Sequence, residues 1–263
     1  MSTLSLSTRD IHVLEKIKDP ESDPSRGVSI DASLPSDPKV TDRTLYLQIS
    51  QLEREIVFAM QSLEMQMAGN RPSSGTDPIT GYKECIQRLD SLVEAHPDYA
   101  SARNNRAQAL RRLYGDSMLL ATTDSLPHAL IKDPVGDERK RVAGIVLSDL
   151  DHSIALLTPP AKASLSPQTA KTLSMAHTQR AAIYHMTSKL FTSGSLSVEG
   201  GRREAAWSML EFEEAASRDF AMGGRYGNDI AKGLAVSTNP TAKLCGQIVR
   251  EAMKKEYGPG YVN

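Results

Sequence analysis

Metal binding or acid–base catalysis would require histidine, cysteine and carboxylate side chains at close, regular spacing, and the sequence offers little of this kind. The six histidines include no pair four positions apart, and no His-Glu-x-x-His run occurs. His177 and His185 fall on one predicted helix but are eight residues apart. We therefore predict no metal site, no cofactor and no catalytic histidine.

Nucleophilic or phosphate-binding chemistry is equally poorly supported. Cys85 and Cys245 are 160 positions apart, which indicates neither a disulfide framework nor a thiolate metal site. Both fall among apolar residues of predicted helices, so we interpret them as buried packing residues. The run Gly223-Gly224-Arg225-Tyr226-Gly227 lacks the preceding strand of a phosphate-binding loop, so we predict a flexible break between short helices. The sequence thus favours a protein that is not an enzyme.

Charge and hydropathy narrow the possible partners. The net charge is −1, so no strong field attracts nucleic acid or anionic lipid. The densest basic cluster, residues 139–141, adjoins two acidic residues and is predicted to be a solvated loop face. No run approaches the ~18 apolar residues needed to cross a bilayer. Residues 1–9 lack the apolar core of a signal peptide. We predict a cytoplasmic protein that binds neither nucleic acid nor membrane.

The first 43 residues differ from the remainder of the chain. Residues 11–18 have apolar side chains at helical spacing and predict a short helix. Residues 19–43 contain four prolines and few large apolar side chains, so they cannot offset the entropy of ordering. We predict a short N-terminal helix followed by a mostly disordered arm.

From residue 45 onward, apolar residues recur every three or four positions, which predicts helices almost throughout. Asp77-Pro78 and Ser166-Pro167 are typical helix starts, with a capping side chain followed by proline in the first turn. No alternating pattern with turn dipeptides predicts a strand. The fold class is therefore all-α, with helices over about 45–67, 78–96, 98–114, 142–157, 167–190, 202–217 and 219–236, and a last one starting at 240.

Internal similarity suggests helix pairs. The runs 105–110 and 179–184 share a polar-Arg-Ala-x-x-large pattern, typical of the first helix of a tetratricopeptide (TPR) unit. We predict a right-handed α-solenoid of three degenerate TPR pairs with a linking helix within 44–236. The C-terminal helix, in 237–263, has an apolar seam and is predicted to cap the array. The pairs are assigned to residues 44–97, 98–160 and 167–217.

Several segments resemble the tetratricopeptide repeat protein 36 family. The likeness rests on residues 13–20, 102–116, 149–154 and 239–247, which look like that family's N-terminal helix, second repeat and C-terminal cap. The resemblance implies three repeats, no enzymatic activity and a link to the Hsp70 chaperone. The long turns of this chain depart from the family pattern.

The first helices of the repeats should line a concave face that binds a partner polypeptide. A TPR carboxylate clamp uses five donors, and of the five corresponding positions only Asn105 matches. Any Hsp70 contact is therefore predicted not to use a full clamp. The predicted partner-binding residues are Asn104, Asn105, Gln108, Arg111, Arg112, Thr178, Gln179 and His185.

These patterns predict a monomeric, non-enzymatic TPR adaptor, or an Hsp70-associated co-chaperone, with a protein partner in its groove. The alternative is a structural module that forms a homodimer through its N-terminal helix or its C-terminal helix. The sequence patterns do not identify the partner.

Overall fold

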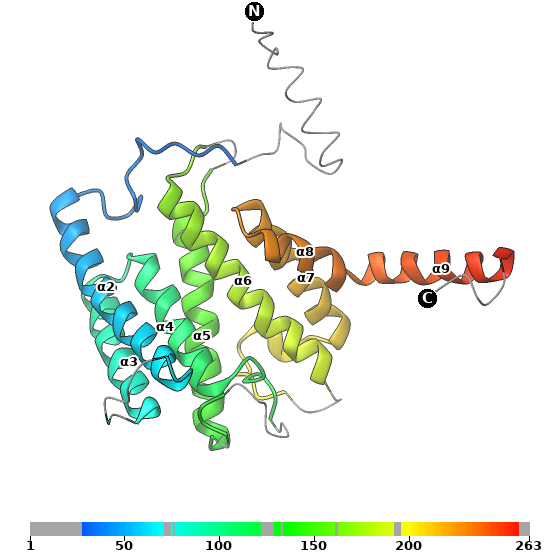
Figure 1. Cartoon of the computed structure of the whole chain (residues 1–263), viewed down its shortest axis with the longest axis horizontal. Helices are drawn as coiled ribbons and strands as arrows, with labels where there is room; N and C mark the ends of the chain where they lie inside the picture. The colour runs from blue at the N-terminus through cyan, green and yellow to red at the C-terminus, as the bar shows by residue number, and fades with distance from the viewer. Residues whose placement is uncertain are drawn as a thin grey trace, which may run out of the picture.

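The structure is a computed structural model, and its described part is helical. The all-α prediction is confirmed, with two isolated β-bridges and no strand among the described residues. The predicted helix at residues 11–18 lies outside them. The structure describes residues 28–70, 75, 77–121, 129–132, 134–160, 163–191 and 196–257. The helices, drawn in Figure 1, are α2 (Arg43–Met67), α3 (Pro78–Ala95), α4 (Ala100–Tyr114), α5 (Gly136–Leu157), α6 (Pro167–Leu190), the 3-10 helix η2 (Arg203–Ala206), α7 (Met209–Arg225), α8 (Asp229–Thr238) and α9 (Pro240–Tyr257).

Side-chain caps explain why four of the helices begin where they do. Asp42 accepts hydrogen bonds from the first-turn amides of α2, and Asp77 and Ser166 do the same for α3 and α6. Proline occupies the first turn of both α3 and α6. At the start of α7, Ser208 forms a reciprocal capping box with Glu211. These signals satisfy amides that the helix itself leaves unpaired.

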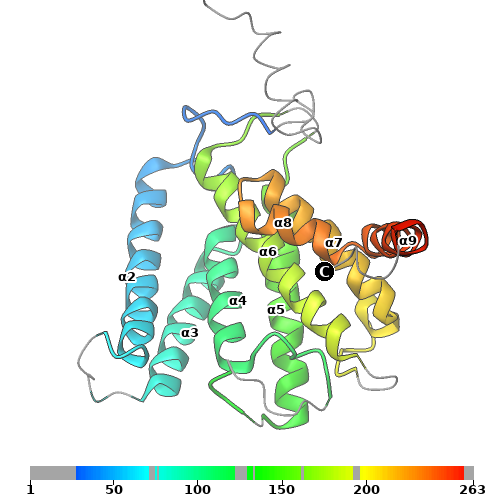
Figure 2. The same ribbon diagram turned by 45° about the vertical axis from the view of Figure 1, so that its right-hand side comes forward.

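Consecutive helices pack against one another from α2 to α8. In addition, α4 contacts both α2 and α6, so these three helices lie side by side, as Figures 1 and 2 show. The main hydrophobic core lies between α2–α7 and includes the fully buried Leu89, Leu150 and Phe212. Phe212 also contacts the rings of Tyr184 and Trp207, at centroid distances of 5.9 and 5.2 Å.

Only the end of the glycine run is the break between helices that we predicted: Tyr226 and Gly227, the latter with a φ of 105°, lie between α7 and α8. Helix α7 continues through Gly223 and Gly224. A Cβ on Gly223 would lie 2.5 Å from Thr178 Oγ1 on α6, and one on Gly224 would lie 2.8 Å from the backbone of Lys232 on α8. The missing side chains therefore allow α6 and α8 to approach α7 closely.

The predicted solvated loop face at residues 139–141 also differs from the structure. These residues belong to the start of α5, where Arg139 is buried and donates to the backbone carbonyls of Leu120 and Ala121. Lys140 and Arg141 are exposed as expected. The buried arginine is stable there because carbonyl oxygens of the preceding connection satisfy its guanidinium.

Residues 28–42, expected to belong to a disordered arm, form an ordered extended segment. The amide of Asp31 and the carbonyl of Ser29 both pair with the backbone of Leu165, at 2.8 Å each. Further along, the Ser166 hydroxyl donates to the carbonyl of Ser36. These partners lie on the connection between α5 and α6, which no local pattern in the arm could indicate.

Helix α9 does not form the predicted cap. Figure 1 shows it extending away from the body of the molecule, and α8 packs against α7 instead. Asn239 caps the new helix by accepting from the amides of Thr241 and Ala242. The apolar seam therefore meets no other described helix along most of its length, and Cys245, predicted to be buried, is exposed. Cys85 is buried as predicted.

Candidate binding groove

One cavity of the described structure lies where α2, α4 and α6 run side by side. Its volume is about 1240 Å³, and we call it the α2–α4–α6 groove. Both polar and apolar side chains line it. The lining residues are Tyr46, Ser50, Glu53, Arg54, Val57, Met60, Gln61, Glu64, Met65, Tyr82, Tyr99, Ser101, Asn104, Asn105, Gln108, Ala109, Arg111, Arg112, Gly115, Asp116, Gln168, Lys171, Thr172 and Met175.

The residues that we predicted on α4 all line this groove. They follow the i, i+3, i+4 spacing that places side chains on one face of a helix. Within the groove, their exposure differs: the side chain of Gln108 is exposed, whereas those of the two asparagines are buried. The five residues are Asn104, Asn105, Gln108, Arg111 and Arg112.

The residues that we predicted on α6 do not line the groove. Thr178 faces α8, where its hydroxyl accepts from the side-chain amide of Asn228 at 3.2 Å. The His185 ring makes an edge contact with Phe220 of α7. Gln179 is buried between α4 and α6 and donates to Asn104 Oδ1 at 2.8 Å. The groove-lining face of α6 carries Gln168, Lys171, Thr172 and Met175. Thr178 and His185 are turned about a quarter of a circle away from it, whereas Gln179 lies on the same face, one turn beyond Met175.

The contribution of α2 was missed by the sequence analysis. Its groove face carries Ser50, Arg54 and Gln61, which are separated by four and seven positions as on one helical face. Two of its leucines, Leu47 and Leu52, are exposed, so the apolar residues of this helix do not all mark its buried face. The polar residues that lie between the buried residues of α2 could have indicated its groove face.

Two groove arginines are already paired within the protein. Arg111 makes two hydrogen bonds to the Asp116 carboxylate, at 2.7 and 2.9 Å. Arg112 donates to Glu64 at 2.6 Å. Because these carboxylates neutralise them, the two guanidinium groups contribute shape and rigidity more than net charge. Arg54 of α2 and Lys171 of α6 are exposed and have no hydrogen bond or ion pair within the described residues.

The floor of the groove contains a buried carboxylate, Glu53. Its oxygens accept hydrogen bonds from the Tyr99 hydroxyl at 2.5 Å and from Asn105 Nδ2 at 2.7 Å. Burial raises the pKa of Glu53, and the nearby charge of Asp37 adds to this, while hydrogen bonds from Tyr99, Ser101 and Asn105 act in the opposite direction. Unlike the carboxylates on the rim, Glu53 therefore favours its protonated form more than an exposed glutamate does.

This raised pKa predicts how Glu53 affects stability. The folded state holds a proton that the unfolded state releases above its ordinary value of 4.5. The stability contribution is therefore full below that value and is lost as the pH rises through the folded-state pKa. We expect Glu53→Gln, which resembles the protonated acid, to lose less unfolding free energy between pH 5 and pH 7 than the native chain in urea titrations.

Glu55→Gln is the matched control, because Glu55 lies on the same helix and is exposed. Its titrations should parallel those of the native chain. If the unfolding free energy of Glu53→Gln changes with pH as steeply as that of the native chain, Glu53 is ionised in the folded protein across this range.

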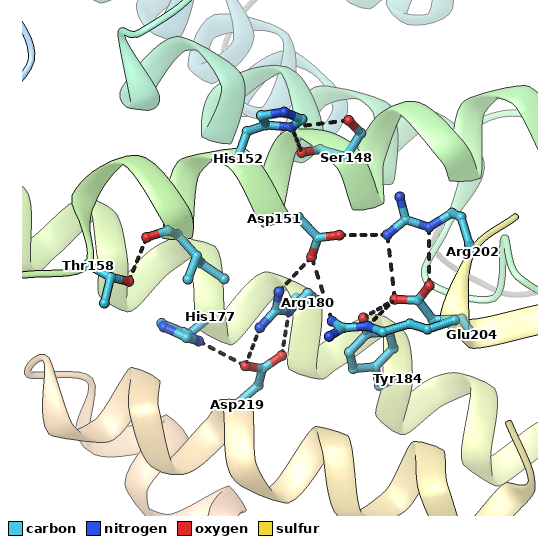
Figure 3. A network of polar contacts seen from close by, with 12 residues as sticks. Ser148, Asp151, His152, Thr158, His177, Arg180, Tyr184, Arg202, Glu204 and Asp219 are labelled. Carbon is cyan, nitrogen blue, oxygen red and sulfur yellow. Dashed lines mark hydrogen bonds and ion pairs between the residues drawn. The ribbon is translucent and has the colours of Figure 1, made fainter.

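A second polar cluster joins α5, α6 and α7 beside the core (Figure 3). Asp219 of α7 accepts from His177 Nδ1 at 2.8 Å and from Arg180 Nε at 2.7 Å. Burial would raise the pKa of Asp219, but the hydrogen bonds from Arg180 and His177 hold it below its ordinary value. Arg180 also donates to Asp151 of α5 at 2.6 Å.

The same cluster continues to the segment before α7. Arg202 donates to Asp151 and to Glu204, and the Tyr184 hydroxyl donates to Glu204 at 2.7 Å. Figure 3 shows these side chains pointing toward one another, so the acids and bases satisfy each other. The imidazole–carboxylate pair of His177 and Asp219 is occupied by Arg180, so we assign the cluster a structural role in joining the helices.

Metal ligands and membrane-spanning helices are the other features considered for the described residues. Among the described residues, no three histidine, cysteine or acidic side chains are grouped as metal ligands would be. No helix in the described part of the chain combines the length and hydrophobicity that a membrane span requires.

The fold and the groove together define an all-helical protein whose main surface feature is a polar groove between three helices. The chain belongs to the same family as the L-tyrosine degradation gene cluster protein hmgX of Aspergillus fumigatus. The two are 39% identical over 255 residues, which cover 96% of this chain and 93% of the relative. No protein-family model matches the chain. No solved structure matches it either.

This relationship corrects the resemblance to the tetratricopeptide repeat protein 36 family. The similarity to the Aspergillus protein extends over nearly the whole chain, whereas the earlier likeness rested on short runs such as residues 102–116 and 239–247. Small-then-large spacing recurs wherever two helices pack closely, so such runs do not identify a family. The Hsp70 partner depended on that resemblance and now lacks support.

Proposed function

We propose that this protein is a non-enzymatic adaptor that binds a partner polypeptide in the α2–α4–α6 groove. The observation that carries the proposal is the groove itself, a cavity of about 1240 Å³. Two of its helices carry exposed cationic side chains that have no partner among the described residues. Helix-in-groove contact is a common way for helical proteins to bind one another. The ionisable residues at the floor and rim are mostly hydrogen-bonded to each other, which favours binding over catalysis.

The chemistry of the groove favours an acidic, amphipathic segment. Arg54 and Lys171 lie on opposite helices and can each pair with a carboxylate of the partner. One turn after each of them, Val57 on α2 and Met175 on α6 offer apolar contact, and methionine adapts readily to varied side chains. Gln108 is exposed and can hydrogen-bond with a polar side chain or a free carbonyl.

The finer description of the fold belongs to the same proposal. We infer that α2–α3, α4–α5 and α6–α7 are three degenerate TPR-like pairs in a right-handed solenoid. The side-by-side contacts of α2, α4 and α6 support this, because the first helices of such pairs line the concave face. The groove would then be the concave face of the array.

The relative's name suggests a biological setting. Because that protein belongs to an L-tyrosine degradation gene cluster, we propose that the partner of this chain takes part in L-tyrosine degradation. We further propose the cytoplasm as its compartment, since both cysteines are free thiols.

The experiment is a comparison of captured proteins. The tagged native chain and the double variant Arg54→Glu, Lys171→Glu are each incubated with extract from cells grown on L-tyrosine. Bound proteins are then quantified by mass spectrometry. The proposal expects a protein of L-tyrosine degradation to be captured by the native chain and lost from the variant. Equal capture by both proteins would reject the groove as the binding site.

A further inference from the structure

Helix α9 presents an apolar face to solvent. Leu244, Ile248 and Val249 are 56%, 57% and 56% exposed, values unusual for large aliphatic residues on one face of a helix. Cys245 and Ala252 of the same face are also exposed. Figures 1 and 2 show α9 extending from the α7–α8 end of the molecule, away from α2. The face therefore has room for another helix along most of its length.

The six apolar residues that form the seam of α9, which does not include Ala242, have the same spacing in either direction along the helix. They occupy positions 244, 245, 248, 249, 252 and 253, which are symmetric about the midpoint between 248 and 249. In an antiparallel pair of identical helices related by a two-fold axis, each residue lies opposite its mirror position. Position 244 would then lie opposite 253, 245 opposite 252, and 248 opposite 249. Apolar would meet apolar at every position.

We propose that this face binds a second copy of the chain, with the two α9 helices antiparallel and the axis between Ile248 and Val249. The proposal therefore favours the homodimer, which was the alternative in the sequence analysis, over the predicted monomer. It makes use of the seam that the predicted cap would have buried.

The charges at the two ends of α9 are compatible with this arrangement, because one of the two lysines that it brings together is neutralised within its own chain. At its start, Lys243 is paired with Glu213 of α7, which places this end beside the acidic residues 213–214. At its end, Lys254 and Lys255 fall in the last turn. Antiparallel pairing would bring Lys254 of one copy opposite Lys243 of the other, whose charge Glu213 neutralises within its own chain.

The expected contact area requires more than α9 alone. An 18-residue helix is about 27 Å long and about 10 Å wide, whereas stable interfaces bury roughly 800 Å² per partner. The remainder is available on α7, where Met209 and Leu210 are 51% and 50% exposed. Leu210 lies one turn before Glu213, so the apolar surface continues from the start of α9 onto α7.

Cysteine cross-linking tests both the dimer and its direction. In the proposed register, Cys245 of one chain lies opposite residue 252 of the other. The two native Cys245 residues are instead about 10 Å apart along the axis, beyond the reach of a disulfide. Under mild oxidation, Ala252→Cys should form a disulfide-linked dimer, whereas the native chain should not. Light scattering of the native chain at tens of micromolar should give the dimeric mass.

Two further variants distinguish cross-links formed within the proposed α9 pair from cross-links formed by random collision of chains. Ile248→Glu, added to Ala252→Cys, should abolish the cross-link and give a monomer. Gln247→Glu adds the same charge outside the apolar seam, so it should leave both the cross-link and the dimeric mass unchanged. A monomeric native chain, or cross-linking that persists with Ile248→Glu, would overturn the proposal. Equal cross-linking of the native chain through Cys245 would also overturn it, because it would indicate parallel pairing.

Discussion

Replacing Asp219 with alanine is expected to lower the free energy of unfolding by about 3–5 kcal/mol, since the change leaves a buried charge without its main partner. The side chain of Asp219 is 8% exposed and accepts from both Arg180 and His177. His177 Nε2 already has no hydrogen-bond partner among the described residues, so the variant would leave both of its ring nitrogens unpaired. Urea unfolding followed by circular dichroism measures the loss.

Asp229→Ala is the control for this prediction. Asp229 is an exposed aspartate on the adjacent helix α8, so its loss should change the free energy of unfolding by no more than about 0.5 kcal/mol. Asp219→Asn retains a hydrogen-bond acceptor, so its loss of unfolding free energy should lie between those of Asp219→Ala and Asp229→Ala. A cost for Asp219→Ala as small as that of the control would mean that the cluster in Figure 3 does not hold α6, α7 and α5 together.

Charge reversal in the groove is the second prediction with a large effect. Arg54→Glu with Lys171→Glu should weaken binding of the captured partner by roughly 100-fold, or about 3 kcal/mol, because like charges then face the acidic segment. Both side chains are exposed and without partners in the described structure, so the fold should remain stable. Titration calorimetry with the purified partner measures the change.

The control reverses two positive charges outside the groove. Lys140→Glu with Arg141→Glu alters two exposed residues of α5, a helix that contributes nothing to the groove lining. It should leave the affinity within about twofold, apart from long-range effects that salt screens. If both double variants weaken binding equally, the effect would come from net charge rather than from the groove.

Local sequence signals predicted the helices better than their packing. Asp77-Pro78 and Ser166-Pro167 mark helix starts through contacts within a few residues, and the structure places α3 and α6 there. The course of residues 28–42 depends on backbone partners around Leu165, more than 120 positions away. The direction of α9 likewise depends on how α8 packs on α7, which the apolar seam of α9 does not encode.

The groove could be predicted only in part for a similar reason. The face of α4 was identified because its apolar and polar residues alternate clearly, and all five residues line the cavity. On α6, buried polar residues such as Gln179 and Ser174 blur this pattern, so Thr178 and His185 were assigned to the wrong face. On α2, exposed leucines widened the apparent apolar stripe and hid the groove face.

The central claim, that the α2–α4–α6 groove holds a partner polypeptide, is tested most directly by cross-linking from within it. A photoreactive amino acid is placed at Gln108 in the groove or at Lys140 outside it, and the adducts formed in cells are identified by mass. Our account predicts an adduct from position 108 with a protein of L-tyrosine degradation, abolished by the Arg54→Glu, Lys171→Glu change. An adduct with the same protein from position 140 and none from position 108 would contradict it.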